Sequence, residues 1–306
     1  MITTSAVTSV TQSTAVSGGT ISYQGASAIT ARGVCWSTSP SPTIANSITS
    51  NGTGIGTFTS NLSGLIGGTT YYVRAYATNG SGTSYGNQVS FVAVNPQPAY
   101  PANSVFCASG PTLVVDVTNP TTGKTWMDRN LGATQVATSS TDAAAFGDLY
   151  QWGRATDGHQ CRTSATTTTL SATDQPGNAF FILAPNSPFD WRSPQNANLW
   201  QGVNGVNNPC PIGYRLPTTS ELTSEKQSWT VAFSAGAFLS PLKLTLGGNR
   251  THLGSLNATS SSGYYWTSSI DNVNLYMIKY LYFTANQDYI GDGYRANGMS
   301  IRCIKN

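Results

Sequence analysis

The chain has 306 residues, long enough for two domains that each bury a hydrophobic core. Only 9% of the residues are Asp, Glu, Lys or Arg, against about 25% in ordinary soluble domains, so Ser, Thr, Asn and Gly must supply most of the polar surface. The net charge of +3 is not gathered in a basic cluster, which argues against nucleic acid as a partner. No apolar run approaches the roughly 20 residues of a transmembrane helix, and the first residues lack the basic and apolar regions of a signal peptide.

Residues 1–93 are predicted to form an all-β sandwich. Short runs rich in Thr, Val and Ile alternate with Gly- and Asn-containing turn signals, at a spacing that suits about seven strands. Residues 70–77 alternate in polarity as a half-buried strand does. Residues 62–65 followed by 71–76 resemble the last strands of an immunoglobulin-like fibronectin type III domain, and 31–43 resemble the version carried by many Bacteroidetes surface proteins. That resemblance implies a spacer, with an adhesive role as the alternative.

Residues 94–104 are predicted to link this sandwich to a second domain. Prolines at positions 96, 98 and 101 favour an extended and fairly stiff spacer. Residues 105–306 mix strand-like and helix-like segments with long irregular stretches. We therefore expect an α+β domain to follow the all-β one.

The second domain is predicted to contain short helices at 142–146 and 219–228. The second helix has a capping box: Thr218 accepts from the third backbone N–H, and the Glu221 side chain reaches back to the start. A polar tip at 286–293 follows one strand and precedes the last. The predicted strands are 113–117, 124–127, 275–283 and 299–305.

Five blocks of the second domain occur in an order that resembles a known family. The most specific block spans 210–222 and reads Cys-Pro-Ile-Gly-Tyr-Arg-Leu-Pro-Thr-Thr-Ser-Glu-Leu. The blocks resemble the Fibrobacter succinogenes major paralogous domain (FISUMP), which is common in secreted Bacteroidetes proteins. That family is itself similar to the formylglycine-generating-enzyme branch of the C-type-lectin-like fold. The other four blocks are 128–133, 147–154, 265–269 and 300–305.

The resemblance implies a C-type-lectin-like fold for residues 105–306 in a protein that is secreted or held at the cell surface. We therefore expect the chain to be the mature or an excised part of an exported protein. Two departures from the family are Leu222, where Trp is usual, and a Thr/Ser-rich insertion at 161–173. Because Arg215 and Trp152 lie in shared blocks, we expect both to be structural, with Arg215 partly buried and bonded to a carboxylate or to carbonyl groups.

The five cysteines are predicted to form two disulfides and one free thiol. Cys35 lies in an apolar, strand-like context of the first domain, where a buried thiol packs as a small hydrophobe. The resemblance to C-type-lectin-like domains implies a bridge between Cys210 and Cys303, which leaves Cys107 to pair with Cys161. No Cys-x-x-Cys occurs, so we expect neither a zinc site nor a thioredoxin-like motif.

No catalytic or metal-binding constellation is predicted. The related oxidases use a reactive cysteine pair that this sequence lacks, and His159 and His252 are too few for an iron site. Oxygen-rich turns occur at 288–293 and at Asp271–Asn272, so calcium is the alternative to an absence of cofactors. Turn aspartates more often bond their own backbone, and we expect no metal.

The ligand-binding face is predicted at the carboxyl-terminal strand pair and its tip. Tyr276, Ile278, Tyr280 and Tyr282 share one face of a strand, and Tyr together with Asn is typical of adaptable recognition surfaces. The alternative is that one tyrosine row packs in the core, in which case the loops around 162–177 would hold the site. The predicted binding residues are Tyr276, Tyr280, Tyr282, Asn286, Asp288, Tyr289, Asp292 and Tyr294.

Taken together, these patterns predict an extracellular, non-catalytic binding or adhesion protein. Its fibronectin-like spacer would present a lectin-like recognition face to an extracellular glycan or protein receptor. The alternative is a structural subunit that self-assembles into a filament or sheath, since the chain is low in charge and rich in Ser and Thr. An oxidase is a third hypothesis, which the missing cysteine pair disfavours.

Overall fold

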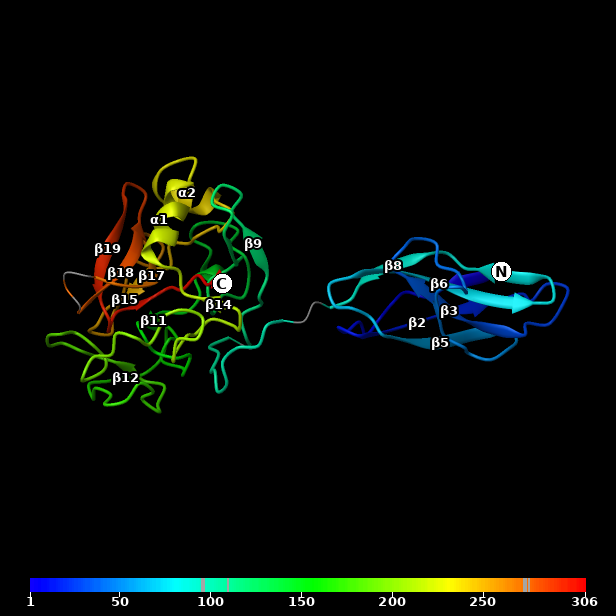
Figure 1. The fold of residues 1–306 in the computed structure, drawn as a ribbon, viewed down its shortest axis with the longest axis horizontal. Coiled ribbons are helices and arrows are strands. Elements are labelled where there is room, and N and C mark those ends of the chain that lie inside the picture. The colour runs from blue at the N-terminus through cyan, green and yellow to red at the C-terminus, as the bar shows by residue number, and fades with distance from the viewer. Residues whose placement is uncertain (95–96, 109, 272–273, 275) are drawn as a thin grey trace. The chain divides into compact units, whose positions relative to one another are not determined.

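A computed structural model describes residues 1–94, 97–108, 110–271, 274 and 276–306. The chain divides into two compact units, Met1–Gln97 and Pro98–Asn306, and strands are more numerous than helices in both (Figure 1). No helix within the described ranges is long and apolar enough to cross a membrane.

The predicted linker needs a correction, because its second half belongs to the second unit. The Ile212 backbone N–H donates to Ala99 O at 2.8 Å, and the Tyr100 hydroxyl donates to Thr112 O at 2.9 Å. Tyr100 also packs partly buried against the core of that unit. Tyr100, which lies between Pro98 and Pro101, therefore anchors this segment to the second unit and is not part of a free spacer. Residues 95 and 96 of the predicted linker lie outside the described residues.

The first unit is a sandwich of two antiparallel sheets, as the sequence of residues 1–93 led us to expect. One sheet has the order β1-β2-β5; the other has the order β4-β3-β6-β7, with β8 also paired to β6. Side chains alternate along β5, where Phe58 and Leu62 point into the core and Asn61 points outward. The strands are β1 (Ile2–Thr4), β2 (Thr14–Ile21), β3 (Ala31–Ser37), β4 (Ser47–Ile48), β5 (Gly56–Ser63), β6 (Thr70–Asn79), β7 (Gly82–Tyr85) and β8 (Val89–Val92).

Charged side chains are almost absent from the first unit, whose residues 1–97 contain only Arg32 and Arg74. Arg32 donates to three backbone carbonyls in the segment that leads into β5. Arg74 lies over the Tyr85 ring at 4.7 Å. Cys35 is buried and free, as predicted, and burial raises the pKa of its thiol to about 11. The backbone ladders and the hydrophobic core, not ion pairs, therefore hold this unit together.

The second unit has short strands in several small sheets, two α-helices and long loops (Figure 1). The sheet orders are β14-β21-β10-β9, β11-β20-β15-β16, β12-β13 and β17-β18-β19. Elements up to the helices are β9 (Asp116–Thr118), β10 (Thr125–Met127), the 3-10 helix η1 (Ala143–Ala145), β11 (Tyr150–Gln151), β12 (Thr166–Thr167), β13 (Phe181–Ile182), β14 (Tyr214–Arg215), α1 (Thr219–Gln227) and α2 (Phe233–Leu239). The later strands are β15 (Asn249–Arg250), β16 (Leu256–Asn257), β17 (Gly263–Ile270), β18 (Met277–Phe283), β19 (Asp288–Tyr294), β20 (Gly298–Met299) and β21 (Ile304–Lys305).

Several predicted elements differ from those observed. The strand expected at 299–305 is divided into β20 and β21, which belong to different sheets. The helix expected at 142–146 is the single 3-10 turn η1, and Asp142 caps it. The capping box of α1 is confirmed, with both of its bonds present. Helix α2 was not predicted at all.

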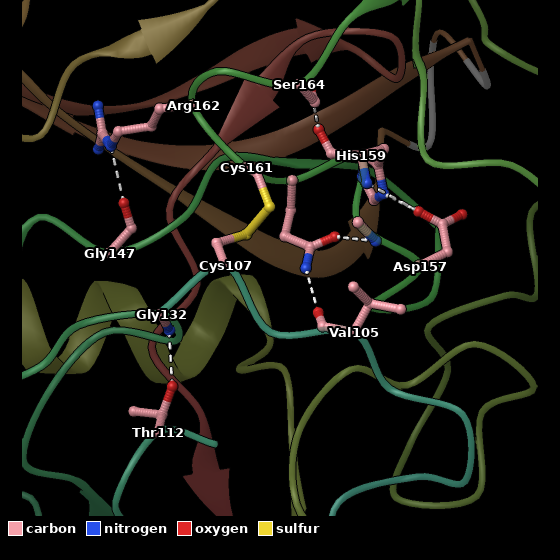
Figure 2. The surroundings of a disulfide bond; sticks show 12 residues. Val105, Cys107, Thr112, Gly132, Gly147, Asp157, His159, Cys161, Arg162 and Ser164 are labelled. Atoms are coloured by element: carbon pink, nitrogen blue, oxygen red, sulfur yellow. Dashed lines mark hydrogen bonds and ion pairs between the residues drawn. A yellow bond between two sulfur atoms is a disulfide. The ribbon is translucent and has the colours of Figure 1, made fainter. Parts of the chain in front are cut away.

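Two disulfides join distant parts of the second unit, in the pairing that the family resemblance implies. Cys210 and Cys303 are 93 residues apart, and both are buried in the core. Cys107 and Cys161 are 54 residues apart. Figure 2 shows that the second bridge lies among loop segments. Hydrogen bonds also connect these segments, including one from the Gln160 side chain to Val105 O at 2.7 Å.

Buried cationic side chains connect the blocks that carry the family resemblance. Arg302 is fully buried; it donates twice to Asn130 Oδ1, at 3.1 and 2.9 Å, and once to Leu242 O at 2.5 Å. Burial lowers the pKa of Arg302 to about 10. The prediction for Arg215 is confirmed, because this side chain forms a bidentate salt bridge with Glu221, with both N–O distances at 2.8 Å. Trp152 is also internal, and its Nε1 donates to Thr267 O.

Candidate functional site

The sheet β17-β18-β19 has one covered face and one partly open face. Helices α1 and α2 pack against the covered face (Figure 1). There Tyr265, Leu281 and Phe283 join the core with Leu222 of α1 and Ala237 of α2. Because side chains alternate along a strand, the neighbours of these residues point to the opposite face.

Four tyrosines gather on that opposite face; we call Tyr264, Tyr280, Tyr282 and Tyr289 the tyrosine surface. Tyr264, Tyr282 and Tyr289 stand directly opposite one another across the three strands. The ring centroids of Tyr264 and Tyr282 are 4.9 Å apart, and those of Tyr282 and Tyr289 are 4.8 Å apart. Tyr289 is 43% exposed. The row is therefore a continuous aromatic strip that reaches solvent at the β19 end.

Along the strands, the tyrosine surface is continuous with the hydrophobic core. Trp266 and Ile278 lie on the same face and are fully buried, and Tyr280 packs partly buried against them. Gly291 stands opposite Tyr280, and a Cβ at that glycine would lie 2.9 Å from the Tyr280 ring. The missing side chain lets the ring lie over the backbone. Burial raises the pKa of Tyr264 to about 12 and also raises that of Tyr280, so these phenols are neutral and able to donate hydrogen bonds at physiological pH.

The charged residues of the β18–β19 hairpin all lie on the covered side. Lys279 contacts Asp292 at 2.7 Å and Asp271 at 3.4 Å. Asp288 contacts Lys226 of α1 at 2.7 Å, and it accepts from the Phe233 backbone N–H at 3.1 Å. The three strands thus contribute no charged side chain to the tyrosine surface.

The structure divides the predicted site instead of bringing its eight residues together. Tyr280, Tyr282 and Tyr289 share the tyrosine surface, and Asn286 lies exposed in the adjoining turn. The grouping was wrong for Asp288, Asp292 and Tyr294, because even-numbered positions of β19 point to the other face. Tyr294 instead packs against Phe189 and His252, with centroids 4.3 and 5.3 Å away. Tyr276 precedes β18 and is 55% exposed.

Sequence reasoning missed Tyr264. It stands immediately before the block 265–269 and outside the predicted strands. The detectable signal was the spacing of Tyr264 and Trp266, two positions apart in β17, which places both side chains on one face of the strand. Pairing β17 with β18 would have aligned Tyr264 with Tyr282.

His159 is structural in this geometry. It is fully buried; its Nε2 accepts from the Gln151 backbone N–H at 3.0 Å, so Nδ1 carries the proton toward Asp157 Oδ1 at 2.6 Å (Figure 2). Burial, helped by the Arg154 charge, lowers the pKa of His159 to about 4. Both ring nitrogens are therefore occupied by the protein itself.

No metal cluster is assembled among the residues that the structure describes, in which no three His, Cys, Asp or Glu groups converge. Asp288 and Asp292, considered above as calcium ligands, are each held by a separate lysine. Asn272, from the other oxygen-rich turn, lies outside the described residues.

A cleft of about 690 Å³ lies beside the loops named as the alternative site. Gln175, Asn178, Val105 and Val206 are among the residues that line it, and Asp157 is its charged member. The Asp157 carboxylate already accepts from Arg154 through one oxygen and contacts His159 through the other. With these contacts made inside the protein, the cleft offers little to a charged ligand, and the tyrosine surface is the stronger candidate.

Comparisons with known proteins find only local similarity. No protein-family model matches the chain, and no curated protein sequence matches it. The sensor domain of the anti-sigma factor RsgI4 of Pseudobacteroides cellulosolvens is 13% identical, with 31% of this chain and 95% of that domain covered and a TM-score of 0.27. The sixth fibronectin type III domain of human fibronectin type III domain containing protein 3 is 21% identical, with 30% and 81% covered and a TM-score of 0.24. Each similarity spans less than half of the chain.

Proposed function

We propose that the chain is a secreted or cell-surface binding protein without catalytic activity, and that the tyrosine surface is its recognition site. Two disulfides in the second unit support an oxidising, extracellular location. The observation that carries the proposal is the partly exposed tyrosine row, to which its three strands add no charged side chain.

The second unit is proposed to be a C-type-lectin-like domain of the FISUMP family, preceded by a fibronectin-like spacer. Support comes from the five sequence blocks and from what their residues do. Arg302 and Asn130 join two of the blocks, while Arg215 and Glu221 close a contact within a third. Shared residues that hold the fold leave the rest of the surface free to vary with the ligand.

Tyrosine rows of this kind suit recognition for a physical reason. Each ring offers a large apolar area with only two rotatable bonds, and its hydroxyl adds a hydrogen-bond donor and acceptor. Here the rings brace one another at 4.8 and 4.9 Å, which reduces the freedom lost on binding. This surface fits two classes of ligand: an extracellular glycan and a protein receptor.

The test is a binding screen with matched tyrosine variants. Labelled protein is applied to a glycan array and to immobilised extracellular matrix proteins, and hits are measured by surface plasmon resonance. We expect Tyr282→Ala with Tyr289→Ala to abolish binding. Tyr23→Ala is the control, because Tyr23 is 69% exposed but lies in the first unit. Binding that survives the double substitution would remove the tyrosine surface from consideration.

Self-assembly into a filament or sheath is a second candidate function. The first unit contains no Asp, Glu or Lys, so little electrostatic repulsion would oppose its association with other copies. Negative-stain microscopy and sedimentation of the purified protein at rising concentration distinguish the two functions. Polymers without added ligand favour the structural role, and a stable monomer that binds a ligand favours recognition.

A further inference from the structure

The sheet that carries the tyrosine surface has one open edge in the described chain, and that edge is β19. At the opposite side, β17 is closed by Ser300, which accepts from the Trp266 N–H and donates to Tyr264 O, both at 3.1 Å. Strand β19 pairs with β18 through seven consecutive residues without a bulge, and it has no other strand partner.

The hairpin fixes which backbone groups of β19 face outward. Thr284 N–H donates to Gln287 O at 2.8 Å across the turn. Since hydrogen-bonded and non-bonded pairs alternate in an antiparallel ladder, Tyr289 and Gly291 bond to β18. The N–H and C=O groups of Ile290 and Asp292 therefore point away from the sheet, and no described residue bonds to these groups.

Both ends of this open stretch are occupied by the protein. At one end, the Asp288 carboxylate holds the Phe233 N–H of α2. At the other end, the Asn297 N–H donates to Tyr294 O at 3.0 Å. What is left is a short docking edge, residues 289–293, which we call the β19 edge.

We propose that the β19 edge binds an extended peptide segment of a partner protein, which adds a fourth strand to the sheet. This inference rests on the proposed recognition function and assigns it a partner class. The outward groups of Ile290 and Asp292 supply main-chain hydrogen bonds, as in strand-addition complexes. Side chains of the added strand alternate between the two faces, so every second one lies beside Tyr289 and the others lie beside Asp292.

The chemistry on the two sides of the edge defines the peptide. Beside Tyr289, an aromatic or aliphatic side chain extends the tyrosine surface. On the other side, Lys279 is shared by the carboxylates of Asp271 and Asp292, which leaves one net negative charge, and the Asp292 side chain is 39% exposed. The edge thus fits a segment in which apolar residues alternate with Lys or Arg.

In the register centred on Ile290, a second copy of this chain fits the edge poorly. In an antiparallel pairing of two copies centred on Ile290, Asp292 of each copy would stand opposite Asp288 of the other. Like charges directly opposite one another destabilise a strand pair. Charged residues are a common protection of sheet edges against self-pairing, and here their acidic character also favours a basic partner.

The first experiment is selection of peptides from a phage library of random dodecapeptides on the full chain. We expect enriched peptides to alternate apolar and basic residues. Ile290→Pro removes the outward N–H without touching the ladder to β18, and we expect it to weaken the selected peptides about tenfold. Ile290→Ala is the matched control, because it trims the same side chain and keeps the N–H. No enrichment, or equal binding to Ile290→Pro, would overturn the proposal.

Hydrogen exchange provides a second readout that does not depend on the stability of a variant. A bound peptide should slow exchange of the Ile290 and Asp292 amides in the unaltered protein, and unchanged exchange at both would count against strand addition. Asp292→Asn should weaken binding about threefold and reduce its salt dependence. If Tyr282→Ala with Tyr289→Ala abolishes receptor binding while Ile290→Pro leaves it intact, the proposed function stands and the strand addition fails.

Discussion

The two units of this chain stabilise β-rich structure in different ways. The first unit consists of two regular sheets with long antiparallel ladders, two arginines and no disulfide. The second has mostly strands of two or three residues, two disulfides and several fully buried cationic side chains. The difference shows what irregular backbone requires: peptide groups that no ladder satisfies must find side-chain partners.

Two side chains of the second unit illustrate this requirement. Gln151 donates to Ile182 O and Ala296 O, both at 2.8 Å, and thereby joins three chain segments. Arg302 does the same for Met127 O and Leu242 O. Among the described residues of the first unit, Arg32 bonds three backbone carbonyls but from a partly exposed position, and the ladders already pair most of the backbone. The second unit should therefore be the more sensitive to loss of single covalent or polar contacts.

The largest expected difference between the units comes from the disulfide in the core. Replacing Cys210→Ser together with Cys303→Ser opens a loop of 93 residues, and chain-entropy estimates give a loss of about 4.6 kcal/mol. Calorimetry should show two transitions, of which only that of the second unit moves to lower temperature. A shift of both transitions would mean that the units unfold together.

Removing a buried cation tests the same comparison without a covalent change. Arg302→Met keeps the volume and leaves Asn130 Oδ1 and two buried carbonyls without their donor. We expect the free energy of unfolding of the second unit to fall by about 3 kcal/mol. Arg32→Met is the matched substitution in the first unit, where the guanidinium is partly exposed, and it should cost clearly less by urea denaturation.

Changing the pH should affect the second unit alone. Burial raises the pKa of Asp148 to about 7, against the pull of Arg162. The folded carboxyl then binds a proton that the unfolded one has lost, so its contribution to stability falls as pH rises from about 4 to about 7. Between pH 5 and pH 8, Asp148→Asn should gain about 2 to 3 kcal/mol relative to the unaltered protein. The first unit has no Asp, Glu, His or Lys, and its transition should stay constant over this range.

The smallest stability change is expected at the tyrosine surface. Tyr282→Ala with Tyr289→Ala removes one partly buried and one exposed ring, for which we expect a combined loss of about 1 kcal/mol by thermal unfolding. A loss of about 3 kcal/mol or more would show instead that these rings are core residues. Such a result would mean that these rings stabilise the fold, as core side chains do in the first unit, and it would weaken the proposed function.

The sequence predicts an element well when the contacts that stabilise it are close together in the chain, and poorly when they are distant. Alternation along the chain was sufficient for the sandwich, and the local pair of Thr218 and Glu221 was sufficient for α1. Helix α2 has no side-chain cap of its own, since Ala232 stands at its N-cap. Asp288, 55 residues away, accepts from its first N–H. A cap supplied by tertiary structure leaves no local signal.

The candidate site shows the same limit. The residue types of the tyrosine surface were predicted, because Tyr280, Tyr282 and Tyr289 are visible as a cluster. Their separation from Asp292 and Tyr294 was missed because 286–293 was predicted to be a polar tip, whereas Asp288–Tyr294 form strand β19, along which side chains alternate between the two faces. Which of these faces is open depends on the packing of α1, and the hairpin sequence alone does not show that packing.

The near absence of charge in the first unit also bears on proteolysis. Enzymes that cut after Lys, or beside Asp or Glu, find no target in residues 1–97, and trypsin finds only Arg32 and Arg74. Both arginines lie in strands β3 and β6, which pair with each other at the centre of one sheet. A protease needs its substrate extended and unpaired in its cleft, so these two bonds become cleavable only when the sheet opens. The first unit should therefore resist enzymes specific for charged residues while its sheet stays paired, without any covalent cross-link.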